Sequence, residues 1–595
     1  MNDTNNRQMP FGHELQKNWL SLTLVAWALI AMCIIWQRWP SIWWLSLSDT
    51  DDNMRLMQVR ALLGGQGWYD LRQYRLNPPA GFDIHWSRIV DLPIAALILA
   101  FKPFVGTVMA EKLACGIAPL LPLSVTMAGL AFTVRRLVSP VAWPLALIFL
   151  LLCTATMLMF MPERIDHHGW QLACLSITVA GLADQRQRRG GIVVGLVSAV
   201  SLSIGLEMLP YAAGAGAIMA LRWVWDRGES DRLSVYGLAL AGGSAIGYVL
   251  FASSANAVLR CDALTPVWLS VMIEAGTLLF VLARINPDGR TIRLALAAAA
   301  GIAIITAFAL VFPQCVGRPE QVSPELARNW LNIVREAKPI YDHPWRNALP
   351  VAALPIIGVI GAIIATWRAR RSDRFVPWSA VLLFALLAGG LMLWQVRAGA
   401  AAQLLAVPGA VALGWIVFPW CLGHRSMLVR VFGTVASFII ISGVFVGFAV
   451  KYIAPDKPTL RTKAVNRAGA SCPTIPVLGV LNRLPAQTIF TFVDLGPRLI
   501  TLTHHSAVAG PYHRNGDAIL DVQHAFTGSA DQFRAIARRH GATLLLTCPN
   551  MAESTVYTVR AKQGFYAKLA KGEAPDWLEP VALPAKSPLR LWRIR

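Results

Sequence analysis

Long apolar stretches separated by short polar connections occupy most of the chain. A membrane-spanning helix needs about 20 mostly apolar residues, because a rise of about 1.5 Å per residue must cover about 30 Å of hydrocarbon. Thirteen stretches approach that length, near residues 20–40, 113–134, 143–161, 169–184, 190–206, 208–225, 235–254, 268–284, 292–312, 348–367, 377–396, 399–420 and 428–450. The pattern predicts an α-helical polytopic membrane domain over residues 1–450 with about 13 transmembrane helices.

Arginine is concentrated in the short connections that follow the even-numbered stretches. Examples are Arg135 with Arg136 and Arg370 with Arg371. Lys and Arg are enriched in the cytoplasmic connections of membrane proteins. We therefore expect a multi-pass protein of a bacterial inner membrane with its N-terminus in the cytoplasm. An odd number of spans then places the residues after 450 in the periplasm.

The composition agrees with a membrane protein. Hydrophobic residues make up 55% of the 595 positions and charged residues only 15%, whereas soluble domains carry about a quarter charged residues. The formal net charge of +21 would suggest nucleic acid as a partner in a soluble protein. Because the positive charge follows the topology, we expect no nucleic-acid partner.

The residues after 450 have a different pattern. Short runs at 489–493, 499–502 and 543–547 are typical of strands, and 533–539 has the spacing of a helix. Strands that alternate with helix predict a small C-terminal α/β periplasmic domain over residues 451–595.

Four of the nine cysteines fall on the predicted periplasmic side: Cys261, Cys315, Cys472 and Cys548. An oxidising periplasm would allow two disulfides. The sequence does not fix their connectivity. Pairing Cys472 with Cys548 inside the tail and Cys261 with Cys315 between loops is one arrangement, and four unpaired thiols are the alternative.

Three long polar segments lie on the same side, at 41–112, at 313–347 and after residue 450. Connections of this length often act as lids or binding elements. We therefore expect function at the periplasmic face. Segment 313–347 should form a surface helix with flexible flanks that closes over a substrate.

The first of these segments opens with the acidic run Ser48-Asp49-Thr50-Asp51-Asp52-Asn53. The carboxylates of Asp49 and Asp51 could share one divalent cation, and Mg²⁺ and Mn²⁺ prefer such oxygen ligands. Alternatively, Asp51 or Asp52 caps a helix that begins near Asn53. Because capping uses a single carboxylate, we interpret Asp49 and Asp51 as catalytic or metal-binding residues.

A second polar run, Glu163-Arg164-Ile165-Asp166-His167-His168, fills a connection that a simple turn would serve. Ionisable groups at this depth are costly and usually have partners. The predicted topology places the run on the same face as Asp49. We therefore expect Asp166 to be catalytic and Glu163, Asp166 and His167 to share the metal of Asp49 and Asp51. A hydrated loop held by salt bridges is the alternative.

Further candidates for substrate binding are polar or aromatic residues in the same regions. Aromatic rings suit stacking on sugars, and guanidinium groups suit contact with a phosphate. Interfacial anchors, helix ends in water and snorkelling side chains are the alternatives. The candidates are Arg75, His85, Trp86 and Arg88 in the first segment, Glu207 and Arg397 at the ends of predicted spans, and His505, Tyr512, His513 and Arg514 in the tail.

This layout resembles the GT-C membrane glycosyltransferases, and within them the catalytic subunit of oligosaccharyltransferases. That family has an acidic motif after the first span, to which Asp49-Thr50-Asp51 is similar, and a second after the third span, to which Glu163–Asp166 is similar. A long mobile loop joins spans nine and ten, like 313–347. An arginine near span eleven contacts the lipid phosphate, and Arg397 has that position.

The tail adds one further likeness and one difference. The outer domain of that family begins with Trp-Trp-Asp-Tyr-Gly, and Phe492-Val493-Asp494-Leu495-Gly496 looks similar. Both tryptophans, which help that family to read its peptide acceptor, are missing here. The difference argues against asparagine glycosylation of proteins.

The resemblance implies a glycosyltransferase that takes a sugar or glycan from a polyprenyl-phosphate-linked donor in the membrane. Arg397 would hold the phosphate, and Asp49 or Asp51 would act as general base for the acceptor. A bound metal would polarise the leaving group. The acceptor, a polysaccharide, a lipid or a protein, is left open by the sequence.

Two other functions compete with this one. A transporter or flippase of lipid-linked sugars predicts polar groups at mid-membrane and paired discontinuous helices, whereas the spans here are poor in charge. A non-catalytic assembly protein of the cell envelope would not need Asp49 or Asp166.

Overall fold

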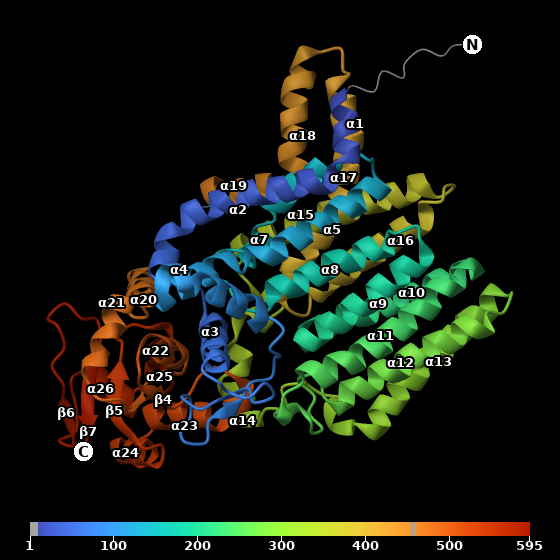
Figure 1. Ribbon diagram of the computed structural model, residues 1–595. Coiled ribbons are helices and arrows are strands. Elements are labelled where there is room, and N and C mark those ends of the chain that lie inside the picture. The colour runs from blue at the N-terminus through green and yellow to red at the C-terminus, as the bar shows by residue number, and fades with distance from the viewer. Residues whose placement is uncertain (1–9, 454–457) are drawn as a thin grey trace, which may run out of the picture.

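The computed structural model describes residues 10–453 and 458–595, and most of them are helical (Figure 1). The helices up to residue 453 are α1 (Pro10–Lys17), α2 (Trp19–Trp43), α3 (Thr50–Leu63), α4 (Asp91–Ile117), α5 (Leu120–Leu137), α6 (Trp143–Leu152), α7 (Thr154–Leu158), α8 (His168–Leu182), α9 (Gln187–Ile204), α10 (Leu209–Trp225), α11 (Ser230–Phe251), α12 (Pro266–Ile285), α13 (Arg290–Val311), α14 (Pro324–Asn329), α15 (Trp345–Ala369), α16 (Phe375–Leu391), α17 (Gly399–Leu422), α18 (Thr434–Ile441) and α19 (Val444–Ile453). Most of the long helices run side by side as one bundle.

Among the described residues, seven helical segments are long and apolar enough to cross a membrane, or eight if the bent pair α18–α19 counts as one span. Each of the thirteen predicted stretches overlaps helical residues. Several are shorter than a full span, because α8, α10 and α16 have 15, 17 and 17 residues. The multi-pass membrane protein is therefore supported, and the count of about 13 spans stays a prediction.

The predicted first polar segment, 41–112, is partly helical. Its last residues belong to α4, which runs with α5 as one apolar stretch from Asp91 to Leu137. Gly106, at φ 75°, interrupts α4, and glycine adopts this left-handed backbone without steric cost. The residues from Asp91 onward therefore belong to this apolar stretch and not to the polar part of the segment.

Helix α17 lies at the centre of the bundle. In an 18-residue apolar stretch of Val396–Leu422, 72% of the residues are buried. The helix contacts α15, α16, α6 and α8. A Cβ on Gly358 of α15 would come within 2.3 Å of the Ala406 carbonyl oxygen of α17. Small residues let helix backbones approach closely, which is how helices associate in lipid without a hydrophobic driving force.

The C-terminal residues form a five-stranded sheet with the order β4-β3-β5-β7-β6. β3 is parallel to both β4 and β5, whereas β7 is antiparallel to β5 and β6. The strands are β3 (Thr488–Phe490), β4 (Ser506–Ala507), β5 (Ala542–Thr547), β6 (Leu578–Pro580) and β7 (Arg590–Ile594), and the helices are α20 (Leu460–Ser471), α21 (Ile475–Leu478), α22 (Gly496–Leu502), α23 (Gly516–Thr527), α24 (Ala530–Arg539), α25 (Ala552–Arg560) and α26 (Phe565–Ala570).

The predicted strand at 499–502 is wrong, because these residues belong to α22. Pro497 lies in the first helical turn, where its fixed φ favours a helix. The helix is buried along most of its length against α3. Burial on all sides removes the polar positions that would have shown a helical period, so the apolar run resembled a strand.

The first polar segment and the C-terminal residues are joined as one body. Leu76 forms a parallel bridge with Ala507, so the segment extends the sheet beyond β4. The Asn77 N–H donates to the Ala507 carbonyl at 2.9 Å. Met54, Met57 and Leu76 belong to the same hydrophobic core as the sheet. A short hairpin in this segment pairs β1 (Arg72–Gln73) with β2 (Phe82–Asp83).

The predicted lid segment, 313–347, contains the six-residue helix α14 and several short turns. Leu326 of α14 is buried against Gly516 of α23. At its far end, the Val396 N–H donates to the Lys338 carbonyl at 2.7 Å. Two points of the segment are therefore docked, Leu326 on the C-terminal residues and Lys338 on the residue before Arg397.

The structure pairs Cys261 with Cys315 and Cys472 with Cys548. This is the arrangement that we suggested, and the alternative of four unpaired thiols is wrong. The first disulfide joins the α11–α12 connection to the start of segment 313–347. The second joins the end of α20 to the end of β5.

Candidate functional site

Helix α3 carries the first acidic run and begins at Thr50, not near Asn53. Asp49, rather than Asp51 or Asp52, is its N-cap. The Asp49 carboxylate accepts from the Asp51 N–H at 2.8 Å, and the Asp52 carboxylate accepts from the Asp49 N–H at 2.9 Å. This reciprocal capping box uses one oxygen of each carboxylate, so each has a second oxygen for other contacts.

Those second oxygens meet the second polar run. Arg164 forms ion pairs with Asp49, with Asp166 at 2.9 Å and with Asp52 at 3.6 Å. The Asp166 N–H donates to the other Asp52 oxygen at 3.0 Å. We call Asp49, Asp52, Asp166 and Arg164 the carboxylate cluster. The structure thus brings together the two acidic runs, which lie on separate elements of the chain.

The members of the carboxylate cluster differ in access to solvent. The side chain of Asp49 is 40% exposed, whereas those of Asp52 and Asp166 are 0% and 1% exposed. Burial, together with the charges of Asp49 and Asp166, raises the pKa of Asp51 well above its ordinary value. Although burial opposes ionisation, His168 and Arg164 hold the pKa of Asp166 below its ordinary value. Asp49 is therefore the member of the cluster that a substrate can reach most easily.

The predicted metal ligands do not form a metal site in this arrangement. Within residues 10–453 and 458–595, no three His, Cys, Asp or Glu side chains are grouped to hold a metal ion. The guanidinium of Arg164 lies between the carboxylates, where the charge of a cation would be needed. Glu163 is buried apart from them, and both its carboxylate oxygens have no hydrogen-bond partner among the described residues. Burial raises the pKa of Glu163 to about 8.

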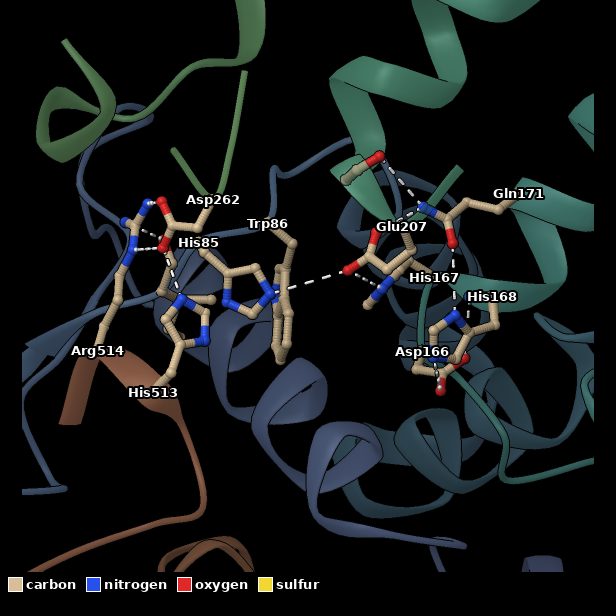
Figure 2. Close-up of polar contacts among 12 residues, drawn as sticks. His85, Trp86, Asp166, His167, His168, Gln171, Glu207, Asp262, His513 and Arg514 are labelled. Atoms are coloured by element: carbon tan, nitrogen blue, oxygen red, sulfur yellow. Dashed lines mark hydrogen bonds and ion pairs between the residues drawn. The ribbon is translucent and has the colours of Figure 1, made fainter. Parts of the chain in front are cut away.

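Histidines and one glutamate form a second group beside the carboxylate cluster (Figure 2). Glu207 Oε1 lies 3.1 Å from His167 Nε2 and 3.9 Å from His85 Nε2. Glu207 Oε2 accepts from Gln171 Nε2 at 2.8 Å. We call His85, His167, Gln171 and Glu207 the histidine cluster. His168, which lies 3.9 Å from Asp166, links the two groups because it also contacts Gln171.

The pKa shifts in the histidine cluster follow from burial and pairing. Although burial opposes ionisation, His167 holds the pKa of Glu207 well below its ordinary value. Burial and the charge of His513 lower the pKa of His85 well below its ordinary value. Burial also lowers the pKa of His167. One carboxylate is thus held among imidazoles that prefer to be neutral.

The comparisons with known proteins find similarity only at the level of structure. No family model and no curated protein matches the chain. A structure of the oligosaccharyltransferase AglB from Archaeoglobus fulgidus, in complex with an inhibitory peptide and a dolichol-phosphate, aligns with TM-score 0.64 and 15% identity over 95% of this chain and 73% of that chain. A second structure from that organism, tethered with an acceptor peptide, aligns with TM-score 0.67 and 15% identity over 94% and 72%.

The chain has the GT-C fold. ArnT from Cupriavidus metallidurans, bound to undecaprenyl phosphate, also aligns, with TM-score 0.47 and 11% identity over 96% of this chain and 97% of that chain. The GT-C architecture agrees with the layout that the sequence suggested, in which a helical bundle is followed by a smaller C-terminal part.

Within this GT-C fold, an open cavity of about 550 Å³ borders Asp49. Its polar lining includes Asn53, Asp494 and Arg498, and its apolar lining includes Trp44. It lies between the end of α2, the start of α3 and the C-terminal residues. The most accessible member of the carboxylate cluster therefore faces a space large enough for a substrate.

Tyr512, His513 and Arg514 reach the centre of the GT-C fold from the C-terminal residues. The Tyr512 hydroxyl donates to the Thr50 carbonyl at 2.8 Å. The rings of His513 and His85 are 4.7 Å apart. Asp262, for which the sequence suggested no role, accepts from both His513 and Arg514. In the sequence, only its position next to Cys261 could have suggested a role for Asp262, because a disulfide fixes the connection that contains it.

Several predicted binding residues hold the fold and do not contact either cluster. Arg75 donates to the Thr503 and His505 carbonyls, and Arg88 donates to the Trp68 carbonyl. The ring nitrogens of His505 contact Leu481 and Gln487. These three side chains have backbone partners and are not free for a substrate.

Trp86 and Arg397 occupy contrasting positions. Trp86 is buried, with its ring 4.8 Å from the Arg55 guanidinium and 5.4 Å from the His167 ring. It therefore packs under the histidine cluster and offers no open face for a sugar. Arg397 is exposed and donates to Gln395 at 2.5 Å. A short, exposed hydrogen bond of this kind leaves the rest of its guanidinium open to an anionic ligand.

Proposed function

We propose that the chain is an integral membrane glycosyltransferase. It transfers a sugar or glycan from a polyprenyl-phosphate-linked donor to an acceptor at the periplasmic face of a bacterial inner membrane. The observation that supports this most strongly is the carboxylate cluster, which joins two acidic runs and presents Asp49 to a cavity within a GT-C fold.

The reaction needs a base for the acceptor, and Asp49 has the right position for it. In the proposed step, the acceptor oxygen forms a bond to the anomeric carbon, and its proton passes to the Asp49 carboxylate. The bond between the anomeric carbon and the phosphate oxygen breaks, and the lipid phosphate leaves with the bonding electrons. A positioned base of this kind contributes about 10²- to 10⁴-fold to the rate.

The other members of the carboxylate cluster hold this base in place. Arg164 pairs with Asp49, and the buried Asp166 orients Arg164 from the other side at 2.9 Å. Asp51 follows Asp49 by two residues, in the first turn of α3. Its raised pKa means that it keeps its proton up to a higher pH than an ordinary aspartate does. In this arrangement the residues do not fit a divalent cation, so we derive no step through one.

The donor phosphate requires positive or hydrogen-donating groups. We propose Arg397 for this role because it is exposed, and its neighbour Val396 donates to the carbonyl of Lys338 in segment 313–347. His85 is a second candidate because its side chain is 17% exposed and its Nε2 lies 3.9 Å from Glu207 in the histidine cluster. The structural neighbour from Archaeoglobus fulgidus is in complex with a dolichol-phosphate, which supports a donor of this chemical kind. Segment 313–347 would close over the bound donor.

The acceptor would enter the cavity that Asp49 and Asp494 line. Phe492 and Val493, which stand where oligosaccharyltransferases have two tryptophans, are both buried. We therefore propose an acceptor other than an asparagine in a protein sequon.

The test uses the full chain purified in lipid nanodiscs. A synthetic undecaprenyl-phosphate-linked hexose serves as the probe donor, with water in place of the unidentified acceptor. We expect slow release of undecaprenyl phosphate, measured by mass spectrometry, and we expect Asp49→Asn to reduce it by about 10²- to 10⁴-fold. Asparagine is as good an N-cap as aspartate, so this variant keeps α3 intact.

The matched control is Asp531→Asn, which changes an exposed acid in the first turn of α24, away from the site. It should leave the release unchanged. No release with any of a panel of lipid-phosphate sugars would contradict the proposal. Movement of the intact lipid between leaflets, measured after reconstitution of the same protein in sealed vesicles, would instead support a transporter.

A further inference from the structure

We propose that Asp262 is a positioning residue for the reaction, acting through His513 and Arg514 on His85 and on the first turn of α3. This inference rests on the proposed glycosyltransferase function. It assigns a role to the connection between α11 and α12. That connection contains neither acidic run, and the family resemblance gave it no role.

Asp262 binds two consecutive residues of the C-terminal part. Arg514 donates to both its oxygens, from Nε at 2.6 Å and from the terminal nitrogen at 2.7 Å. His513 Nε2 lies 2.6 Å from the same carboxylate. The three side chains are 8%, 5% and 11% exposed, in the order Asp262, Arg514, His513. A bidentate guanidinium–carboxylate pair is strong and directional, so it fixes the turn that carries it.

The turn that Asp262 holds contacts the site at two points. Tyr512 precedes His513 and donates to the carbonyl of Thr50, the first residue of α3, which lies between Asp49 and Asp51. The His513 ring packs against the His85 ring (Figure 2). The position of the proposed base and the position of the histidine cluster therefore both depend on this turn.

The position of Asp262 is itself fixed. Its neighbour Cys261 is in a disulfide with Cys315, at the start of segment 313–347. Asn256, in the same connection, accepts from Arg514 at 2.8 Å and donates to the His85 carbonyl at 3.4 Å. The connection is thus tied to the lid segment on one side and to the site on the other.

The charge of Asp262 is needed as well as its shape. Although burial opposes ionisation, the hydrogen bonds from Arg514 and His513 hold its pKa below the ordinary value. An uncharged side chain would leave a buried guanidinium without its partner, which costs more than the loss of an exposed pair. The turn would then shift, and a displacement of about 1 Å can cost up to about 100-fold in rate.

The experiment compares two aspartates with the same kinds of partner. Asp521 of α23 contacts His540 at 2.7 Å and Arg539, and it lies outside both clusters. We expect Asp262→Asn to lower the release of undecaprenyl phosphate from the probe donor by about 10- to 100-fold. Asp521→Asn should leave the release unchanged. Asp262→Glu, which keeps the charge, should recover most of the lost activity.

A second readout does not depend on activity. Cryo-electron microscopy of Asp262→Asn in nanodiscs should show the Tyr512 hydroxyl beyond hydrogen-bond distance of the Thr50 carbonyl. If the wild-type chain releases no lipid phosphate, the proposed function fails, and this structure still tests the inference. Full activity of Asp262→Asn with the Tyr512 contact kept would overturn it, as would equal losses in Asp262→Asn and Asp521→Asn.

A milder variant covers the case in which Asp262→Asn does not fold. His513→Gln removes the ring that contacts Asp262 and His85 but keeps the Arg514 fork. We expect folded protein with at least about a tenfold lower release, because His85 loses its ring partner. Unchanged release by folded His513→Gln would overturn the inference.

Discussion

The carboxylate cluster and the histidine cluster lie side by side but are built on different principles. In the first, three carboxylates surround one guanidinium that is charged at all physiological pH values. In the second, one carboxylate lies among imidazoles whose pKa values are lowered. The first cluster is therefore built around one permanent positive charge, although burial and the charges of Asp49 and Asp166 raise the pKa of Asp52 within it. The charges of the second cluster depend on its histidines.

This contrast suggests a division of tasks. A base must be held in place before the acceptor arrives, which suits a cluster built around a permanent guanidinium charge. A group that receives a leaving phosphate can gain a proton as negative charge develops, which suits histidine. The proposed reaction uses both properties at neighbouring positions.

The largest effect is expected from the exposed carboxylate. Asp49→Asn should reduce the release of undecaprenyl phosphate by about 10²- to 10⁴-fold, because it removes the proposed base. Binding of undecaprenyl phosphate, measured by thermal shift, should change little. A variant with normal release would remove the carboxylate cluster from the chemistry.

The next largest effect concerns the cation of that cluster. Arg164→Gln leaves three carboxylates without their partner and should lower the stability by about 3–5 kcal/mol. The same change should increase the thermal stabilisation by Mn²⁺, because the ion can take the place of the guanidinium. The control is Arg539→Gln, whose exposed pair with Asp521 should contribute about 1 kcal/mol or less. Equal Mn²⁺ effects in Arg164→Gln and the wild type would contradict this account.

A smaller effect is expected in the histidine cluster. His85 and His167 have lowered pKa values, so the unfolded chain takes up their protons first, and stability is lost as the pH falls below about 6.5. Glu207 raises both pKa values. Between pH 7 and pH 5, Glu207→Gln should therefore lose about 1 kcal/mol more of its free energy of unfolding than the wild type loses. Thermal unfolding at the two pH values measures it, and parallel curves for the variant and the wild type would show that the carboxylate does not act on the histidines.

A last effect, with the opposite dependence on pH, concerns Glu163, which precedes Arg164 in the chain. Its folded pKa of about 8 is above that of the unfolded chain, so its protonated form stabilises the fold fully below about pH 4.5, and this contribution is lost as the pH rises through 8. Glu163→Gln should remove this dependence and gain stability relative to the wild type at pH 8–9. Melting temperatures at pH 6 and pH 9 measure the difference, and a constant difference would show that Glu163 is already ionised.

Helices and strands were predicted well from the sequence where the hydrophobic pattern allows only one kind of secondary structure. The apolar stretches became helices, and the two acidic runs meet as expected. The strand predicted at 499–502 became α22, because a helix buried on all sides has no polar face to reveal its period. The number of membrane spans is a prediction still, since several helices are too short to decide it.

The individual roles of side chains were harder to predict. Arg75 and Arg88 looked like phosphate ligands, yet they donate to backbone carbonyls. An arginine can satisfy its five donors with carbonyl groups as readily as with an anion, and sequence alone does not distinguish the two. Asp262 was missed because its partners, His513 and Arg514, are some 250 residues away.

The bridge between Leu76 and Ala507 also constrains how the protein is made. The first polar segment leaves the ribosome early, yet the strand that it pairs with follows only much later. The Arg75 side chain donates to the His505 carbonyl across 430 residues. The first turn of α3 therefore lacks its contact with Tyr512 until synthesis is nearly complete. A chain that stops before residue 507 carries the acidic runs but has no edge strand to receive the first segment.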